Sequence, residues 1–320
     1  MPKSIRKIFT DTVIVLTAIT VFVITYNIYR YVDMRAVIDY YMAPKETERL
    51  SKPVRAKGLI LTNAYGLGNQ LFIYAAALHF KRKFGIAVYL IHDPTTKEHT
   101  TKDYRKMFKD VEEIDATDPR VVDATPFKFS KLNAKAYTDD NEIPVDKNVY
   151  IRIGVNLFHN FKKIRNIIPE VKYNILSVLQ PMYSMKVINN PNTSAFIHIR
   201  RGDFKYYMFG QLMLSASYYN SGLSVLDAND KVETIYIISN DIPWCKQQIW
   251  NTHKKIVYFD DPDELKTLYL MSQCWAGAVI SRSTFSLWGV FLGAYGKTDS
   301  IVYSRSVHFL EDLPKTWITL

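Results

Sequence analysis

Ala195-Phe196-Ile197-His198-Ile199-Arg200-Arg201-Gly202-Asp203 is the stretch on which the fold prediction depends, because an apolar strand pattern leads directly into a turn with two arginines. A guanidinium presents a rigid fork of donors that matches two phosphate oxygens at once. Ligands of an α/β sheet bind at the ends of its strands, so this turn is suited to hold phosphate. The alternative is an ion pair between an arginine and Asp203 that ties down a surface turn.

The same order of strand, polar turn and helix repeats through the C-terminal part of the chain. Apolar runs predict the strands, and Asp263 is suited to cap a helix. Such repetition predicts a doubly wound, mostly parallel sheet whose polar turns meet at one edge. We expect strands at Ala195–Ile197, Thr234–Ile238, Ile256–Phe259, Ala276–Ile280 and Ile301–Tyr303, and helices at Trp244–Trp250, Glu264–Ser272 and Ser283–Tyr295.

A second α/β unit precedes this sheet in the sequence. Gly66 and Gly68 stand where the backbone is expected to turn between a strand and a helix. A dinucleotide-binding fingerprint needs a third glycine where this chain has Leu71, which argues against a nicotinamide site. Residues 92–150 show no clear periodicity. The expected elements are a strand at Leu59–Leu61, a helix at Asn69–Phe84 that ends at Gly85, and a strand at Ile86–Ile91.

The N-terminal segment predicts a membrane anchor. Residues 12–29 carry no charge and are close to the roughly 20 residues that a helix needs to cross the hydrocarbon core. Lys3, Arg6 and Lys7 precede this run, which favours a type II topology with the body in the lumen. A cleaved signal peptide is the alternative, although the run is longer than a signal peptide's apolar core. The expected divisions are a cytosolic tail at 1–11, a transmembrane helix at 12–31, a stem at 32–57, and two domains at 58–190 and 191–320.

Charge and cysteine content limit the possible functions. The net charge is +10, but half of it lies in residues 1–58, which argues against a general nucleic-acid binder. The two cysteines, Cys245 and Cys274, form either one bridge in an oxidising lumen or two buried thiols. The sequon Asn192-Thr193-Ser194 predicts a glycan on Asn192, in a loop before the arginine-bearing strand.

Four polar turns are expected to meet at the edge of the C-terminal sheet. A helix that begins at Ser283-Thr284 directs free N–H groups at an anion, and the arginines opposite would neutralise a diphosphate. For each turn, the alternative is a simple helix cap. Asp261-Pro262-Asp263 has the spacing of a metal motif, but a loop followed by a helix cap explains it. The turns carry Arg200 and Arg201, then Ser239, Asn240 and Asp241, then Asp260 and Asp261, and finally Ser281 to Ser286.

The order of these motifs resembles glycosyltransferase family 11, the α-1,2-fucosyltransferases, over residues 58–303. Gly66-Leu67-Gly68-Asn69-Gln70 resembles the opening motif of that family, and His198-Ile199-Arg200-Arg201-Gly202-Asp203 resembles its arginine motif. The arginine turn is shared with α-1,6- and protein O-fucosyltransferases, whereas the opening motif points to family 11. Further segments follow the family in order: Ile238-Ser239-Asn240-Asp241, Trp244-Cys245, and Asp263 through Cys274 to Trp288.

The resemblance implies a GT-B fold of two Rossmann-like domains that transfers fucose from GDP-fucose to a β-galactoside with inversion and without a required metal. It also implies a type II protein of the Golgi membrane. Arg200 and Asp203 are the implied catalytic residues, Asp203 being a candidate base or a group that orients the arginines. The donor-binding residues implied are His198, Arg200, Arg201, Ser239, Asn240, Asp241, Asp260, Asp261, Ser283, Thr284 and Ser286, with Gly66, Gly68, Asn69 and Gln70 in a loop near the donor.

Two other functions stay open at this point. One is transfer of fucose to another acceptor or in another linkage, and the other is a non-catalytic, membrane-anchored glycan-binding protein with the same fold. An arginine turn is costly unless it has a ligand, which favours an enzyme. The segment Lys205 to Gly210 and residues 92–190 follow no recognisable pattern, so they leave the acceptor undetermined.

Overall fold

The structure is a computed structural model that describes residues 57–63, 66–92, 106–127, 150–153, 164–183, 187–206, 210, 213–304 and 313–320. The expected cytosolic tail, the transmembrane helix and all but the last residue of the stem lie outside these residues. Within the described residues, no helix combines the length and apolar character that a membrane crossing requires.

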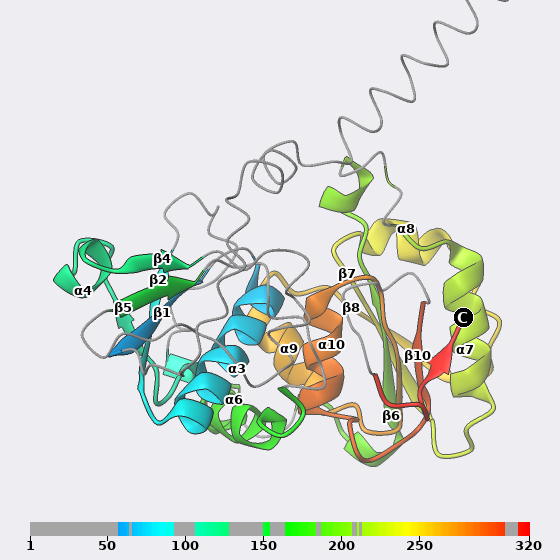
Figure 1. The fold of residues 1–320 in the computed structure, drawn as a ribbon. Helices are drawn as coiled ribbons and strands as arrows, with labels where there is room; N and C mark the ends of the chain where they lie inside the picture. The colour runs from blue at the N-terminus through cyan, green and yellow to red at the C-terminus, as the bar shows by residue number, and fades with distance from the viewer. Residues whose placement is uncertain are drawn as a thin grey trace, which may run out of the picture.

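Two parallel β-sheets form the framework, as the repeated sequence pattern predicts (Figure 1). The first has the order β3-β2-β1-β5-β4, and the second has the order β11-β10-β9-β6-β7-β8. Because β6 lies beside both β7 and β9, the strand order of the second sheet reverses at β6, which is where ligands of such sheets bind. The strands are β1 (Gly58–Asn63), β2 (Ala87–His92), β3 (Glu112–Ile114), β4 (Thr125–Phe127), β5 (Tyr150–Ile153), β6 (Ser194–Ile199), β7 (Thr234–Ser239), β8 (Lys255–Phe259), β9 (Gly277–Val279), β10 (Ile301–Tyr303) and β11 (Ile318–Thr319).

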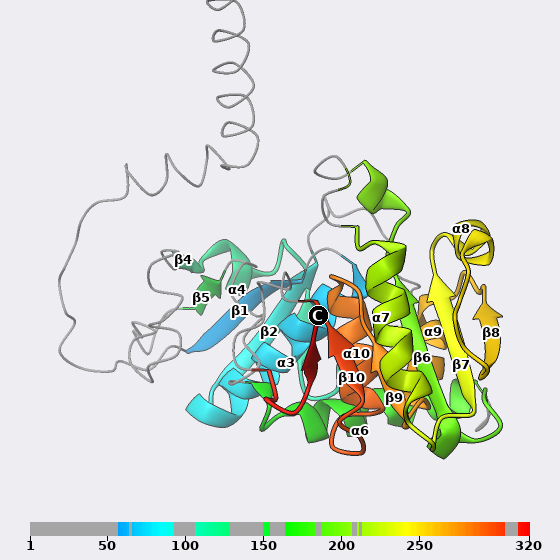
Figure 2. The same cartoon turned by 90° about the vertical axis from the view of Figure 1, so that its right-hand side faces the viewer.

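Four helices lie between the two sheets, and further helices cover the outer faces (Figures 1 and 2). The central helices share one hydrophobic core with the inner faces of both sheets. On β6, Phe196 belongs to this inner core, whereas Ala195 and Ile197 pack on the outer side under α7, as alternation along a strand requires. The central helices are α3 (Leu67–Phe84), α6 (Ile168–Met182), α9 (Glu264–Ser272) and α10 (Thr284–Leu292), and the outer ones are α4 (Pro119–Val122), α7 (Ala216–Asp227) and α8 (Ile242–Gln247).

Helix α3 begins two residues earlier than expected, and this changes the role of one glycine. Gly66 takes the N-cap position, so Gly68 lies inside the first turn rather than in a loop. A Cβ on Gly68 would stand 2.4 Å from the backbone nitrogen of Phe285, because α3 and α10 meet there. Gly85 ends the helix as predicted, with φ of 62° and its N–H bonded to the carbonyl of Lys81.

Two helix ends differ from the sequence prediction. Helix α8 ends at Gln247 rather than Trp250, because the Trp250 indole N–H donates to the Cys245 carbonyl and closes the chain back on the helix. Helix α10 ends at Leu292 rather than Tyr295, where Gly293 forms the cap. Helices α4, α6 and α7 and strands β3, β4, β5 and β11 were not predicted.

Candidate functional site

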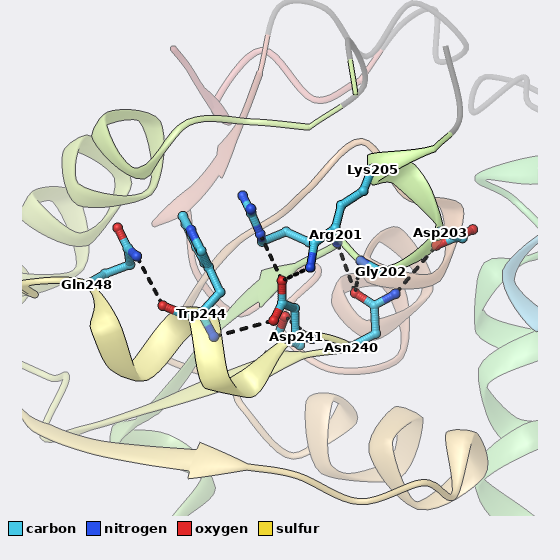
Figure 3. A network of polar contacts seen from close by, with 9 residues as sticks. Arg201, Gly202, Asp203, Lys205, Asn240, Asp241, Trp244 and Gln248 are labelled. Atoms are coloured by element: carbon cyan, nitrogen blue, oxygen red, sulfur yellow. Dashed lines mark hydrogen bonds and ion pairs between the residues drawn. The ribbon is translucent and has the colours of Figure 1, made fainter. Parts of the chain in front are cut away.

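The polar turns singled out in the sequence follow β6, β7, β8 and β9, and the structure brings them to the carboxyl edge of the second sheet. Figure 3 shows the turn after β6 lying against the turn after β7. Strand order alone explains this meeting, because parallel neighbours end at the same edge. The side-chain contacts differ from turn to turn. Some residues fix the shape of a turn, and others have polar groups that are available to a ligand.

Arg201 packs into the fold and holds the turn after β6 against the turn after β7. Its Nε lies 3.2 Å from Oδ2 of Asp241, and its guanidinium carbon lies 3.9 Å from the centre of the Trp244 ring. The side chain is only 16% exposed. The Lys205 ammonium is 2.7 Å from the same carboxylate oxygen. Lys205 and Arg201 together hold the pKa of the Asp241 carboxyl below its usual range.

Asn240 fixes the backbone of the arginine turn. Its side-chain oxygen accepts hydrogen bonds from the N–H groups of Arg201, at 2.9 Å, and Gly202, at 3.1 Å (Figure 3). A Cβ on Gly202 would stand 2.3 Å from Nδ2 of Asn240, so only glycine allows this contact. Asp241 also caps α8 by accepting from the Trp244 N–H at 3.3 Å, and Ser239 accepts from the Asp241 N–H at 2.9 Å. These residues therefore set the shape of the turn.

Arg200 is the more available of the two arginines. Its Nη2 donates to Oδ2 of Asp203 at 2.9 Å, and the two side chains are 31% and 59% exposed. An ion pair this exposed contributes only about 0–1 kcal/mol, so an anion can replace the carboxylate at small cost. The ring of Phe204 lies 5.6 Å from the guanidinium. Arg200 thus combines a fixed position with a weakly held partner.

His198 is buried at the end of β6 and faces the start of α10. Its Nδ1 lies 2.9 Å from the Ser281 hydroxyl, and its ring centre is 5.7 Å from that of Phe285. Burial, together with the charge of Arg200, lowers the pKa of His198 to about 3. The imidazole is therefore neutral at physiological pH and adds no charge to the site.

The first turns of α3 and α10 meet beside this edge. The Thr284 hydroxyl donates to Oδ1 of Asn69 at 2.8 Å, and Ser283 caps α10 by accepting from the Phe285 N–H at 3.3 Å. Two helix N-termini that converge in this way bring two positive dipole ends together, an arrangement that favours an anion.

Two other residues named from the sequence serve the framework. Gln70 is buried and accepts from the side-chain amide of Asn63 at 3.1 Å, which ties the start of α3 to the end of β1. Ser286 is also buried, and its hydroxyl donates to the Ser283 carbonyl at 2.8 Å inside the first turn of α10. Both side chains use their polar atoms in hydrogen bonds within the fold. These bonds help to fix the first turns of α3 and α10.

The acidic residues in the turn after β8 mainly contact α9, the helix that follows them. The carboxylate of Asp261 lies 2.5 Å from the Lys266 ammonium, which lowers the pKa of Asp261 below its usual range although partial burial acts in the opposite direction. Asp263 caps α9, as predicted, by accepting from the N–H groups of Leu265 and Lys266. Asp260 is exposed. Across the described part of the chain, no group of three or more His, Cys, Asp or Glu side chains could hold a metal ion.

Glu264 is a candidate site residue that the sequence reasoning missed. It is the first residue of α9, and its Oε2 is buried without a hydrogen-bond partner. Burial raises the pKa of Glu264 to about 7, although the charge of Arg200 acts in the opposite direction. The sequence signal that could have identified Glu264 is an acidic residue directly after a helix-capping Asp at this edge of the sheet. Both cysteines, Cys245 and Cys274, are buried free thiols.

The fold is that of an α/β protein with two parallel sheets, and its polar turns gather at the carboxyl edge of the second sheet. A model of glycosyltransferase family 11 matches residues 99–312. The chain therefore belongs to glycosyltransferase family 11, a fucosyltransferase family.

Several known proteins are similar to the chain at low identity. The O-antigen biosynthesis glycosyltransferase WbnK of Escherichia coli is 23% identical over 283 residues, which cover 75% of this chain and 91% of WbnK. Human galactoside alpha-(1,2)-fucosyltransferase 1 is 24% identical over 122 residues, or 36% of this chain and 33% of the human protein. The chain thus spans about a third to a half of the length of the mammalian relatives that it matches.

Two solved structures are also similar. Fucosyltransferase NodZ from Bradyrhizobium is 12% identical, with 75% of this chain and 94% of NodZ covered and a TM-score of 0.46. POFUT1 in complex with GDP is 11% identical, with 77% of this chain and 98% of POFUT1 covered and a TM-score of 0.45.

Proposed function

We propose that this protein is an inverting α-1,2-fucosyltransferase that moves L-fucose from GDP-fucose to the 2-hydroxyl of a terminal β-galactoside. The observation that carries the proposal is the exposed, weakly paired guanidinium of Arg200 at the carboxyl edge of the second sheet. Membership of family 11 and the activity named for the mammalian relatives support fucose transfer and the linkage.

The diphosphate of the donor is the ligand that this edge fits. Arg200 donates in pairs to phosphate oxygens, and the free N–H groups of α3 and α10 add donors from the other side. Asp203, which holds Arg200 in position, gives up its exposed ion pair when phosphate arrives. Arg201 is fully engaged with Asp241 and keeps the turn in shape.

The chemical step is a single displacement at C1 of fucose. The bond from C1 to the β-phosphate oxygen breaks, the bond from C1 to the acceptor oxygen forms, and the acceptor proton leaves to a carboxylate. Negative charge collects on the departing GDP, where Arg200 and the helix N–H groups stabilise it. Asp203 is the carboxylate that we assign to the proton, because it is exposed beside Arg200. No metal is assigned to this step.

The same proposal includes the arrangement and location of the protein. Two Rossmann-like units of the GT-B type enclose the donor, and residues 12–31 anchor the chain as a type II protein of the Golgi membrane. The acceptor is then a glycan of the lumen, carried by a glycoprotein or glycolipid.

The test uses the full chain in detergent with GDP-fucose, a panel of β-galactoside and other glycan acceptors, and EDTA. We expect release of GDP and an α-1,2-linked product. A different linkage would replace the assigned specificity, and binding of GDP-fucose without turnover on any acceptor would favour a glycan-binding protein. Failure to bind GDP-fucose would overturn the assigned site.

A further inference from the structure

A hollow lies at the amino edge of the second sheet, at the end opposite the donor site. Its volume is about 1010 Å³, which is at the upper end of the roughly 300–1,000 Å³ of small-molecule sites. The starts of β6, β7 and β9, the end of α7 and the segment before β10 surround it. Its lining includes Asn192, Asn229, Trp275, Lys297 and Asp299.

Asn192 stands exposed at the rim of this hollow and is the acceptor of the sequon Asn192-Thr193-Ser194. Its short turn is held firmly against the start of β9. The backbone N–H of Trp275 donates to the Pro191 carbonyl at 3.0 Å, and the backbone N–H of Ala276 donates to the Ser194 carbonyl at 2.9 Å. A group attached to Asn192 therefore begins beside Trp275.

Trp275 offers a fixed aromatic surface. Its indole N–H donates to the Ser272 carbonyl at 2.9 Å, and the Lys297 ammonium lies 2.9 Å from the ring centre. Burial, with a further contribution from Lys172, lowers the pKa of Lys297 to about 8. An ammonium group donates hydrogen bonds to oxygen acceptors such as hydroxyl and acetamide groups. An aromatic ring beside such donors matches a sugar, which has one apolar C–H face and a polar rim.

We propose that this hollow is the seat of the N-linked glycan on Asn192, with the first N-acetylhexosamine packed at Trp275 and its acetamide oxygen within reach of Lys297. Attachment to Asn192 gives the sugar a high effective concentration, so weak contacts are enough to hold it. The proposal does not depend on the transferase activity, but it rests on the lumenal location that is part of the proposed function.

The structure also sets the order of events. Ser194 is buried, and its hydroxyl donates to the Asn190 carbonyl at 2.7 Å. Because the modifying enzyme must reach this residue, the sugar is attached before β6 joins the sheet. Folding then brings β9 and Trp275 beneath it. The glycan covers polar and apolar surface at the end of the sheet that is distant from the donor site.

The experiment measures how fast a peptide N-glycosidase releases the glycan from the folded full chain. The chain is produced in cells that perform N-glycosylation and kept in detergent, and its mass reports occupancy, with Asn192→Gln as the unglycosylated reference. We expect native release at least about tenfold slower in wild type than in Trp275→Ala, because a contact worth about 1.4 kcal/mol must open first. Trp275→Phe keeps an aromatic ring and should keep most of the protection, and after denaturation all glycosylated forms should release alike.

A second measurement uses wild type alone, in case Trp275→Ala does not fold. Hydrogen exchange of the segments 190–194 and 297–300 should be faster after enzymatic removal of the glycan than before it. Absence of a glycan, equal native release in wild type and Trp275→Ala, or unchanged exchange in both segments would each overturn the proposal.

Discussion

Asn69 and Thr284 are 215 residues apart in the chain, yet the Thr284 hydroxyl donates a 2.8 Å hydrogen bond to Oδ1 of Asn69. Asn69 lies in the first turn of α3, which follows β1 of the first sheet. Thr284 lies in the first turn of α10, which follows β9 of the second sheet. The bond thus joins the two halves of the molecule where the first turns of the two helices meet. In the proposed function, the donor site therefore needs both halves of the molecule in place.

Gly68→Ala should disturb this junction. The added Cβ would stand 2.4 Å from the Phe285 nitrogen, so α3 and α10 must move apart. We expect at least about tenfold weaker GDP binding and a lower melting temperature. Gly66→Ala is the matched control, because a Cβ there meets nothing within 4 Å. Equal GDP affinity in the two variants would show that the junction is not part of the donor site.

The two arginines should respond differently to replacement by alanine. Arg200→Ala should reduce turnover by about 10²–10³ and weaken GDP binding, with the melting temperature nearly unchanged, because its ion pair is exposed. Arg201→Ala should instead destabilise the fold by about 1–3 kcal/mol, since Asp241 and Trp244 lose their shared partner. Calorimetry and GDP titration separate the two effects. Retained turnover in Arg200→Ala would contradict the assigned catalytic role.

Glu264→Gln should change the pH dependence of stability. The pKa of Glu264 is raised from 4.5 to about 7 in the folded chain, so between these values the folded state holds a proton that the unfolded state has lost. This group therefore lowers the free energy of unfolding as the pH rises from 4.5 to 7. The variant should be more stable than wild type at pH 8, by about 1–3 kcal/mol, and similar to it near pH 4.5. Denaturant titrations at both pH values would show a constant difference if the carboxyl did not titrate in this window.

His198→Gln should reduce sensitivity to acid. The pKa of His198 is lowered from 6.5 to about 3, so the unfolded chain takes up a proton below pH 6.5 while the folded chain does not. Stability due to this group is present above pH 6.5 and is lost as the pH falls towards 3. The variant should therefore lose less stability than wild type between pH 7 and pH 4. An identical acid slope in the two proteins would mean that His198 is accessible to protons in the folded state.

Much of the fold could be predicted from local pattern. The strands from β6 to β10 are short apolar runs, and Asp263 and Gly85 act as the helix cap and helix end that their residue types favour. Of the helices that were missed, α6 begins without a side-chain cap, whereas the Ser215 hydroxyl caps α7 by accepting from the Tyr218 N–H. Both helices are stabilised by packing that the local sequence does not contain, α6 against the other central helices and α7 on the second sheet.

The sequence alone determined that a pair of arginines and several polar turns would meet at one edge of a parallel sheet, because strand direction and strand order fix that meeting. Only the tertiary structure decided which arginine is available to a ligand. Asp241 and Trp244, from a different turn, engage Arg201 and leave Arg200 the more exposed of the two. The tertiary structure also placed the carboxylate of Glu264 in a buried position and made Gly68 a packing residue. Local pattern specifies elements and their ends, whereas partners, burial and protonation arise from contacts between residues far apart in the chain.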